Sequence, residues 1–287
     1  MRVAVVTGSQ SCLPEEWRRE MDITVLPYVL EMEGRLLRDG VDIDADGFYR
    51  ELPRLKRPPT TSAISPAAFL EAFRELAPRC EAILVVTISS SFSSTFNNAV
   101  AAAASFSDRP VAVVDSRTAA IACGMVARRA ALESLRGASL EGCRRAAEEE
   151  ASKVELLACV DGLEQLRRSG RVSVLKALAA GALSIRPVLR LREGEAVLEA
   201  RKRSVGSALE HIADRVEQAY RREGPLLLSV FHASAPQMAA RLTEMIMERG
   251  VEAAGGIVPT RFTPMMGCHT GPGIAGAAFV PASGPAS

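Results

Sequence analysis

Residues 82–104 read AILVVTISSSFSSTFNNAVAAAA, and this stretch decides the fold. It opens with the continuous strand pattern Ala82–Ile88, apolar except for Thr87, which is typical of a strand buried on both faces of a sheet. The polar run Ser89–Thr95 follows directly, and the alanine-rich stretch Ala99–Ala104 predicts a helix. Strand, polar loop and helix in this order indicate a parallel α/β sheet with functional loops at the carboxyl ends of its strands.

The same alternation extends outward from this stretch. Val3–Thr7 and Val111–Val114 predict two further buried strands. Ser65-Pro66 supplies a cap and a first-turn proline for one helix, and a second helical pattern runs from about Thr118 to Leu135.

An antiparallel element is expected within the same half of the chain. Ile23–Met32 and Arg35–Arg38 flank the dipeptide Glu33-Gly34, which predicts a hairpin. We therefore expect a first domain over residues 1–155, an open parallel sheet with helices on both faces.

The second half, residues 156–280, is less regular. Pro187–Arg192 and Ala196–Ala200 bracket Glu193-Gly194 as another hairpin, and Leu226–Phe231 predicts a further strand. We expect a second α/β domain with a mixed sheet and helices, followed by a frayed tail over residues 281–287.

Composition narrows the function classes. The 287 residues are 48% hydrophobic and 24% charged, which indicates a folded protein with two domains. The net charge of +1 gives no global attraction to nucleic acid. No lysine follows a glycine, so a Walker A loop is absent, and the six cysteines lack metal-site spacing. We expect reduced, buried thiols in a cytoplasmic protein without a signal peptide, a membrane span or a bound metal.

Hydroxyl-rich loops are the main candidates for chemistry. Hydroxyls and backbone N–H groups at a helix start can hold a carboxylate or phosphate without a lysine, although for any one loop taken alone a cap or turn is the better explanation. The loops are Thr7-Gly8-Ser9, Thr60-Thr61-Ser62, Ser89–Thr95 and Gly267–Gly271.

Other polar features carry less information. Gly271–Gly276 matches G-x-G-x-x-G, but too little chain follows for a dinucleotide-binding unit, so these glycines are expected to let the backbone pass close to a neighbour. Of the three histidines, His269 lies in a hydroxyl-rich loop, His211 on a predicted helix and His232 at a strand end. The basic runs at 167–171 and 201–203 fit either solvated faces or phosphate contacts.

The order of these loops resembles the DegV family of bacterial fatty acid-binding proteins over nearly the whole chain. Each segment is weak alone, and their joint order is specific. The segments are Val6–Ser9 with Leu13-Pro14, Arg38-Asp39-Gly40, Thr60–Ser62 with Ser65-Pro66, Ile88–Ser90 with Ser93–Thr95, Val114–Ser116, Leu163–Arg171, Arg186-Pro187, Arg203, and His269–Gly273 with Gly276 and Phe279.

The resemblance implies two α/β domains with one long-chain fatty acid, of about 14 to 20 carbons, buried between and within them. It implies a lipid-binding subunit of a fatty acid kinase, with no catalysis or cofactor of its own. A separate ATP-dependent kinase would phosphorylate the acid for phospholipid synthesis. The implied carboxylate ligands are Thr61, Ser62, Ser93, His269 and Thr270, and Arg171 and Arg203 match positions near the phosphotransfer surface. We expect a monomer that contacts membranes only transiently, during lipid exchange.

Two positions depart from the family pattern. The first loop usually reads Thr-Asp-Ser, and Gly8 replaces the acid here. The serine loop usually reads Ser-Gly-Thr, and Ser94 replaces the glycine, which changes the loop if a positive φ is needed.

Two other function classes compete with the carrier. An acyl hydrolase or transferase would use Ser93, His269 and Asp115 as nucleophile, base and orienter, although no nucleophile elbow supports it. A DNA-binding regulator is disfavoured by the near-neutral charge and the lack of a recognisable helix-turn-helix.

Overall fold

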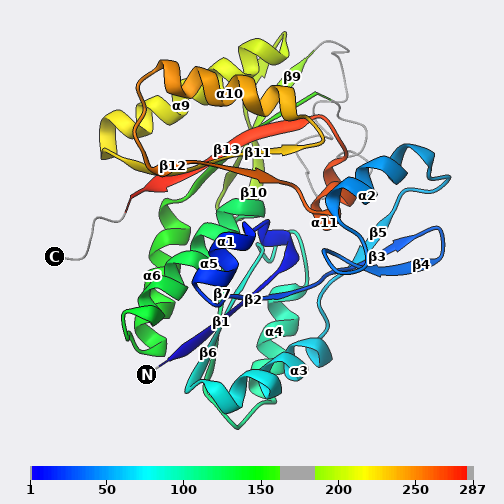
Figure 1. The fold of residues 1–287 in the computed structure, drawn as a ribbon, viewed down its shortest axis with the longest axis vertical. Helices are drawn as coiled ribbons and strands as arrows, with labels where there is room; N and C mark the ends of the chain where they lie inside the picture. Colours follow the sequence, from blue (N-terminus) through cyan, green and yellow to red (C-terminus); the bar gives the residue numbers. More distant parts are fainter. Residues whose placement is uncertain (1, 162–184, 283–287) are drawn as a thin grey trace. The chain divides into compact units, whose positions relative to one another are not determined.

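The computed structural model describes residues 2–161 and 185–282, and these form two compact units (Figure 1). Unit 1 contains the described residues up to Ser152, together with Glu193–Glu195 and Thr263–Met265. Unit 2 contains the remaining described residues from Lys153 onward.

Unit 1 is built on a four-stranded sheet of order β2-β1-β6-β7 in which every pairing is parallel. The central strand β6 is buried along its whole length, as its sequence, apolar except for the terminal Thr87, predicts. The predicted open parallel sheet is therefore confirmed, and its carboxyl edge carries the loops that follow β1, β6 and β7. The strands are β1 (Val3–Gly8), β2 (Thr24–Leu26), β6 (Ala82–Thr87) and β7 (Val111–Asp115).

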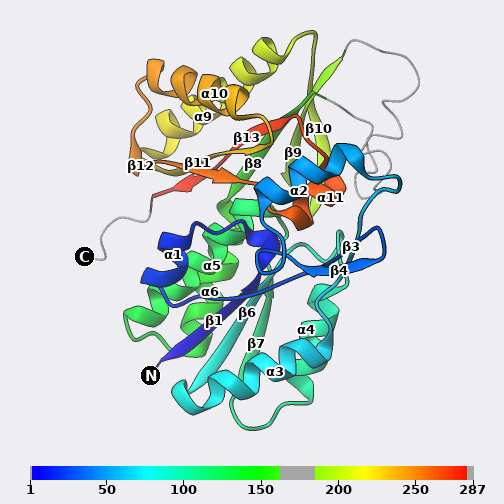
Figure 2. The same ribbon diagram turned by 45° about the vertical axis from the view of Figure 1, so that its right-hand side comes forward.

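Helices cover both faces of this sheet. Figures 1 and 2 show α5 (Ala120–Leu135) and α6 (Leu140–Lys153) on one side and α3 (Pro66–Leu76) and α4 (Thr95–Ala104) on the other. Small residues let α5 lie close to its neighbours, since a Cβ on Gly124 would lie 2.7 Å from the carbonyl oxygen of Ser11.

Local caps fix where several helices begin. The Ser65 hydroxyl accepts the Ala68 N–H of α3 at 3.2 Å, and Pro66 occupies the first helical position, as predicted. Asp44 caps α2 in the same way, accepting the Gly47 N–H at 2.7 Å. The short helices are α1 (Glu15–Glu20) and α2 (Ala45–Glu51), and the 3-10 turns are Ser9–Ser11, Leu52–Arg54 and Ala77–Arg79.

A small antiparallel sheet of order β4-β3-β5 completes unit 1; its strands are β3 (Val29–Met32), β4 (Arg35–Arg38) and β5 (Thr60–Ser62). Glu33 and Gly34, both at positive φ, form the predicted two-residue turn. The prediction of one strand over Ile23–Met32 is wrong: Thr24–Leu26 joins the parallel sheet, and Val29 begins a different sheet. Pro27 lies at the break, where it donates no backbone hydrogen bond.

Unit 2 holds a six-stranded sheet of order β10-β9-β8-β13-β11-β12. The β11–β12 pair is parallel, while β8–β9, β8–β13 and β11–β13 are antiparallel, which confirms the predicted mixed sheet. The elements are β8 (Glu155–Val160), β9 (Arg186–Arg192), β10 (Glu195–Lys202), α9 (Val205–Glu223), β11 (Leu226–Ala233), α10 (Pro236–Glu248), β12 (Ala253–Arg261), α11 (Pro264–Thr270) and β13 (Ile274–Pro281).

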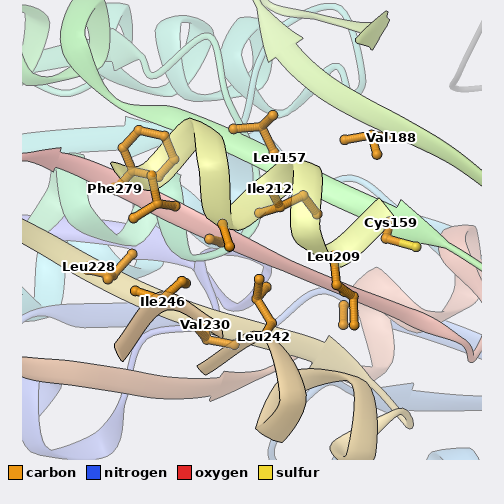
Figure 3. Close-up of a cluster of buried hydrophobic side chains, with 14 of the residues drawn as sticks. Leu157, Cys159, Val188, Leu209, Ile212, Leu228, Val230, Leu242, Ile246 and Phe279 are labelled. Carbon is orange, nitrogen blue, oxygen red and sulfur yellow. The ribbon is translucent and has the colours of Figure 1, made fainter. Parts of the chain in front are cut away.

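The apolar core of unit 2 lies between its sheet and α9 and α10 (Figure 3). Leu209 and Ile212 project from α9 toward Leu157 and Leu228 on the strands, and α10 contributes Leu242. This buried apolar surface is the main stabilising term for the unit.

Three further features bear on the expectations from sequence. All six cysteines are free and buried, as predicted. On β13, a Cβ on Gly276 would lie 2.1 Å from the Leu157 carbonyl oxygen, which confirms that this glycine permits a close backbone approach. Across residues 2–161 and 185–282, none of the helices has the length and apolar character to cross a membrane.

Candidate functional site

A chain of hydroxyls lies at the start of α4 in unit 1. The Thr95 Oγ1 is 2.9 Å from the Ser93 Oγ and 2.7 Å from the Tyr28 hydroxyl, and Ser93 also accepts the Thr95 N–H at 3.3 Å. Burial raises the pKa of Tyr28 to about 12, against opposing hydrogen bonds from Thr95 and Ser93. Tyr28 is therefore neutral at physiological pH, and in each of the Tyr28–Thr95 and Thr95–Ser93 hydroxyl pairs either oxygen can act as the donor.

The predicted hydroxyls of β5 lie beside the strand that follows Tyr28. Thr61 pairs with Leu30 and Ser62 with Val29. Successive residues of a strand face opposite sides, so Thr61 lies on the face of buried Leu30, whereas Ser62 is exposed. The Asn98 side chain of α4 donates to the Ile64 carbonyl at 2.9 Å and ties this segment to the helix that Ser93 precedes.

The serine loop after β6 divides into two parts. Ser89 braces the loop, since its hydroxyl donates to the Gly194 carbonyl at 2.7 Å and accepts the Ser91 N–H at 3.2 Å. Asp115 accepts hydrogen bonds from the Ser90 N–H at 3.2 Å and the Arg117 N–H at 2.8 Å. This carboxylate therefore stabilises the backbone of the two loops that follow β6 and β7. Ser93, by contrast, belongs to the hydroxyl chain.

The replacement at Ser94 leaves the loop unstrained. Its φ of −72° and ψ of 2° are accessible to any residue, so a glycine is not needed.

Gly8 has a steric explanation. Its φ of −102° and ψ of 167° suit any residue, but a Cβ there would lie 2.1 Å from the Gln10 Oε1 and 2.9 Å from both Ile64 Cδ1 and Tyr28 Cε2. Gln10 is fully buried, and its Nε2 donates to the Cys123 Sγ at 3.7 Å. The Gln10 carboxamide thus fills the volume that a side chain at position 8 would occupy.

A buried carboxylate lies behind the hydroxyl chain. The Ser9 Oγ donates to the Asp39 Oδ2 at 2.5 Å and accepts the Tyr28 N–H at 3.2 Å, and the Asp39 N–H donates to the Tyr28 carbonyl at 2.8 Å. Burial raises the pKa of Asp39 to about 6, while Ser9, Thr263 and the Met265 N–H lower it.

Unit 2 carries the predicted residues of the Gly267–Gly271 segment. His269 and Thr270 are the last two residues of α11. The Thr270 hydroxyl donates to the Met266 carbonyl at 3.0 Å within that helix and is buried. Arg203 is exposed just before α9, and Arg171 lies outside the described residues.

The other two histidines have local roles. His232 Nδ1 accepts the Ala235 N–H at 3.3 Å, and burial, reinforced by Arg261, lowers its pKa. His211 lies 3.8 Å from Glu199, and burial lowers its pKa too. Over the described parts of the chain, His, Cys, Asp and Glu side chains form no group of three or more that could hold a metal ion.

Comparison with known proteins identifies the family. The family model described as an uncharacterised protein of the DegV family matches residues 2–282. The chain belongs to the DegV family. A DegV domain-containing protein of Mycobacterium bovis is 34% identical over 278 residues, covering 96% of each chain, and one of Streptomyces coelicolor is 31% identical over 279 residues, also covering 96% of each.

Solved DegV structures share the whole fold. A fatty acid-binding DegV family protein from Thermus thermophilus has a TM-score of 0.92 at 27% identity, covering 98% of this chain and 100% of that one. DegV of Bacillus subtilis, a fatty acid-binding protein, has a TM-score of 0.89 at 27% identity over the same shares. The resemblance inferred from the ordered segments is thereby confirmed.

Reasoning from sequence missed three participants in unit 1. Tyr28 lies between two short strands, Gln10 belongs to no quoted segment, and Asp39 was noted only as part of Arg38-Asp39-Gly40, without a role. Their roles depend on contacts with residues far along the chain, such as Thr95, Thr263 and Cys123.

Proposed function

We propose that this protein binds one long-chain fatty acid and presents its carboxylate to a separate ATP-dependent kinase, which forms an acyl phosphate. The observation that carries the lipid-binding part of the proposal is the likeness, over almost the full chain, to the Thermus thermophilus protein that binds fatty acid. The kinase step rests on the family resemblance of the ordered sequence segments. Burying about 15 methylenes at about 0.8 kcal/mol each gives a gross gain of about 12 kcal/mol before association costs.

The hydroxyl chain supports the choice of a carboxylate head group. Ser93, Thr95 and Tyr28 offer neutral donors, and Thr61 adds another hydroxyl on the neighbouring strand. A carboxylate must be hydrogen-bonded when buried, and neutral hydroxyls satisfy it while leaving more nucleophilicity than a bidentate arginine would. We assign the carboxylate to Thr61, Ser62, Ser93, His269 and Thr270.

The lipid step is tested by extracting the purified protein with organic solvent and analysing the extract by mass spectrometry. We expect a near-stoichiometric fatty acid. A protein that arrives empty and takes up no added palmitate, stearate or oleate contradicts the proposal. Turnover of p-nitrophenyl palmitate would instead favour an acyl hydrolase.

The phosphoryl step is tested with a purified fatty acid kinase, ATP and the palmitate-loaded protein. We expect His269→Ala to reduce acyl-phosphate formation, with His211→Ala, a change on α9, as the matched control. We expect Arg203→Glu to leave palmitate binding unchanged and to reduce acyl-phosphate formation, because Arg203 is exposed and assigned to the partner surface. Full acyl-phosphate formation by both variants would contradict these roles.

A further inference from the structure

We infer that Ser89 is a positioning residue for Ser93: its hydroxyl joins the turn at Gly194 to the serine loop and so fixes the part of the loop that leads to Ser93. Ser89, Ser93 and Gly194 all belong to unit 1, and Ser89 is buried, with 1% of its surface exposed. The inference deepens the proposed function, on which it rests for its ligand.

The chain contains two Glu-Gly turns of the same backbone type, and their surroundings differ. Both residues of Glu33-Gly34 and of Glu193-Gly194 have positive φ, as two-residue hairpin turns require. A Cβ on Gly34 would meet no heavy atom of the described residues within 4 Å, whereas a Cβ on Gly194 would lie 3.0 Å from the Ser89 Oγ. The same dipeptide therefore forms an exposed turn in one place and a turn packed on the serine loop in the other.

Two hydrogen bonds tie Ser89 to segments far along the chain. Its N–H donates to the Thr118 carbonyl at 2.9 Å, and its hydroxyl donates to the Gly194 carbonyl at 2.7 Å. Thr118 belongs to the loop that follows β7, so Ser89 is bonded to two other turns of unit 1. These two bonds fix the place where the serine loop begins.

Two further hydrogen bonds set the course of the loop beyond Ser89. Its hydroxyl accepts the Ser91 N–H at 3.2 Å, and its carbonyl accepts the Phe92 N–H at 3.0 Å. Together these bonds close a tight turn over residues 89–92. Ser93 is the next residue, so the direction in which the chain leaves this turn determines where the Ser93 hydroxyl lies.

The Ser93 hydroxyl makes contacts that depend on this placement. It accepts the Thr95 N–H at 3.3 Å and lies 2.9 Å from the Thr95 Oγ1, which contacts the Tyr28 hydroxyl. The first of these bonds is already at the long end of the hydrogen-bond range, so a small displacement of Ser93 breaks it. Ser89 acts on these groups through the backbone of residues 90–93.

Two substitutions disturb the contact from its two sides. Ser89→Ala removes both hydrogen bonds of the hydroxyl and leaves both backbone bonds in place. Its matched control is Ser90→Ala, because Ser90 is exposed and its described hydrogen bond, to Asp115, comes from its backbone N–H. Gly194→Ala crowds the Ser89 hydroxyl instead, and Gly34→Ala is its control, since it introduces the same positive-φ strain without that contact.

The first measurement compares the dissociation constants of palmitate and methyl palmitate at pH 8. We expect Ser89→Ala and Gly194→Ala to raise the Kd of palmitate about tenfold, because a hydrogen bond from Ser93 to a charged group is weakened. The Kd of methyl palmitate should change less than about twofold, because the ester has the same tail and no carboxylate charge. Both control variants should bind both ligands as the wild type does. Unchanged palmitate affinity overturns the inference, as does an equal loss of affinity for the two ligands, which would indicate general loosening of the fold.

The second measurement needs no ligand and so separates this inference from the proposed function. Hydrogen exchange of the Thr95 amide, which Ser89 does not contact, is followed by NMR in the lipid-free protein. We expect at least about fivefold faster exchange in Ser89→Ala and Gly194→Ala, and wild-type rates in both controls, because the Ser93 hydroxyl no longer protects this amide.

Unchanged exchange of the Thr95 amide overturns the inference even if palmitate binds. Faster exchange in a protein that binds no palmitate supports the placement of Ser93 by Ser89 and contradicts the proposed function alone. If Ser89→Ala does not fold, Gly194→Ala is compared with Gly34→Ala by the same two measurements.

Discussion

Substituting Gly8 tests whether the Gln10 carboxamide fills the space over this residue. In Gly8→Ala the new Cβ would lie 2.1 Å from the Gln10 Oε1, far inside van der Waals contact, with Ile64 and Tyr28 atoms at 2.9 Å. The backbone at Gly8 is extended and costs nothing, so the destabilisation comes from crowding alone. Overpacking of this kind costs about 1–3 kcal/mol, and we expect about 2 kcal/mol.

A double-mutant cycle isolates the contact. Gln10→Ala removes a buried side chain but also relieves a buried carbonyl oxygen without a hydrogen-bond partner, so we expect a net loss of about 1 kcal/mol. In the double variant Gly8→Ala/Gln10→Ala the contact with the Gln10 Oε1 is gone. The double variant should therefore lower the free energy of unfolding by about 1 kcal/mol, whereas the two single changes add up to about 3 kcal/mol. The expected coupling is therefore about 2 kcal/mol.

The single tryptophan makes the assay specific to unit 1. Trp17, on α1, is buried beneath the Arg128 guanidinium, 4.9 Å from its ring centroid, so its fluorescence reports the unfolding of this unit in urea. Gly142→Ala on α6, where the nearest atom would be 3.2 Å from the Cβ, is the control and should not destabilise unit 1, since alanine in a helix is favoured over glycine by up to about 1 kcal/mol. Additivity of the two single changes within about 0.5 kcal/mol would refute the packing argument.

Three further expectations follow from the buried polar groups and the tightest glycine. Folding raises the pKa of Asp39 to about 6, so the stability that protonated Asp39 contributes is full below pH 4 and is lost as the pH rises through 6. Relative to Asp39→Asn, the free energy of unfolding of wild-type unit 1 in urea should therefore fall by about 2 kcal/mol from pH 4.5 to pH 7. A difference between the two proteins that stays constant with pH would contradict this. Tyr28→Phe deprives Thr95 of a partner and should cost about 1–2 kcal/mol and lower palmitate affinity about tenfold, whereas Tyr220→Phe on α9 should retain it; equal affinities would argue against the hydroxyl chain. Gly276→Ala forces a Cβ to 2.1 Å from the Leu157 carbonyl oxygen and should destabilise unit 2 by more than about 3 kcal/mol in thermal melts followed by circular dichroism, and a wild-type melting temperature would be inconsistent with that approach.

The sequence predicts the elements of this fold well where a single physical signal dominates. The five consecutive apolar residues Ala82–Val86 of β6 favour burial on both faces of a sheet, and the Glu33-Gly34 dipeptide specified its hairpin turn directly. The same reasoning failed at Ile23–Met32, because apolar character is continuous across Pro27 while the chain changes sheets there. The strands with which residues 24–26 and 29–32 pair determine the sheet that each joins, and hydrophobic periodicity does not encode pairing partners.

The candidate site shows a similar division. Sequence located the hydroxyl-rich segments that follow β1 and β6, but the other two are not loops, since Thr60–Ser62 form strand β5 and Gly267–Thr270 lie in α11, and sequence could not rank the members of the serine loop. Ser89 and Ser93 are chemically alike and four residues apart, yet one braces the loop against Gly194 and the other joins Thr95 and Tyr28. Only the partners contributed by distant segments distinguish the two roles.

The position of Asp39 relative to the hydroxyl chain has a physical rationale under the proposed function. An ionised carboxylate in direct contact with a fatty acid head group would repel it, while a neutral hydroxyl can donate to it. Ser9 and the backbone of Tyr28 stand between Asp39 and the hydroxyls of Thr95 and Ser93, so the negative charge fixes the donors without facing the ligand. Gly8 follows the same logic, since Gln10 fills its volume with a neutral group where an acidic side chain would add a second charge. Under the proposed function, a carboxylate-binding site built this way keeps its buried charge one layer behind its neutral donors.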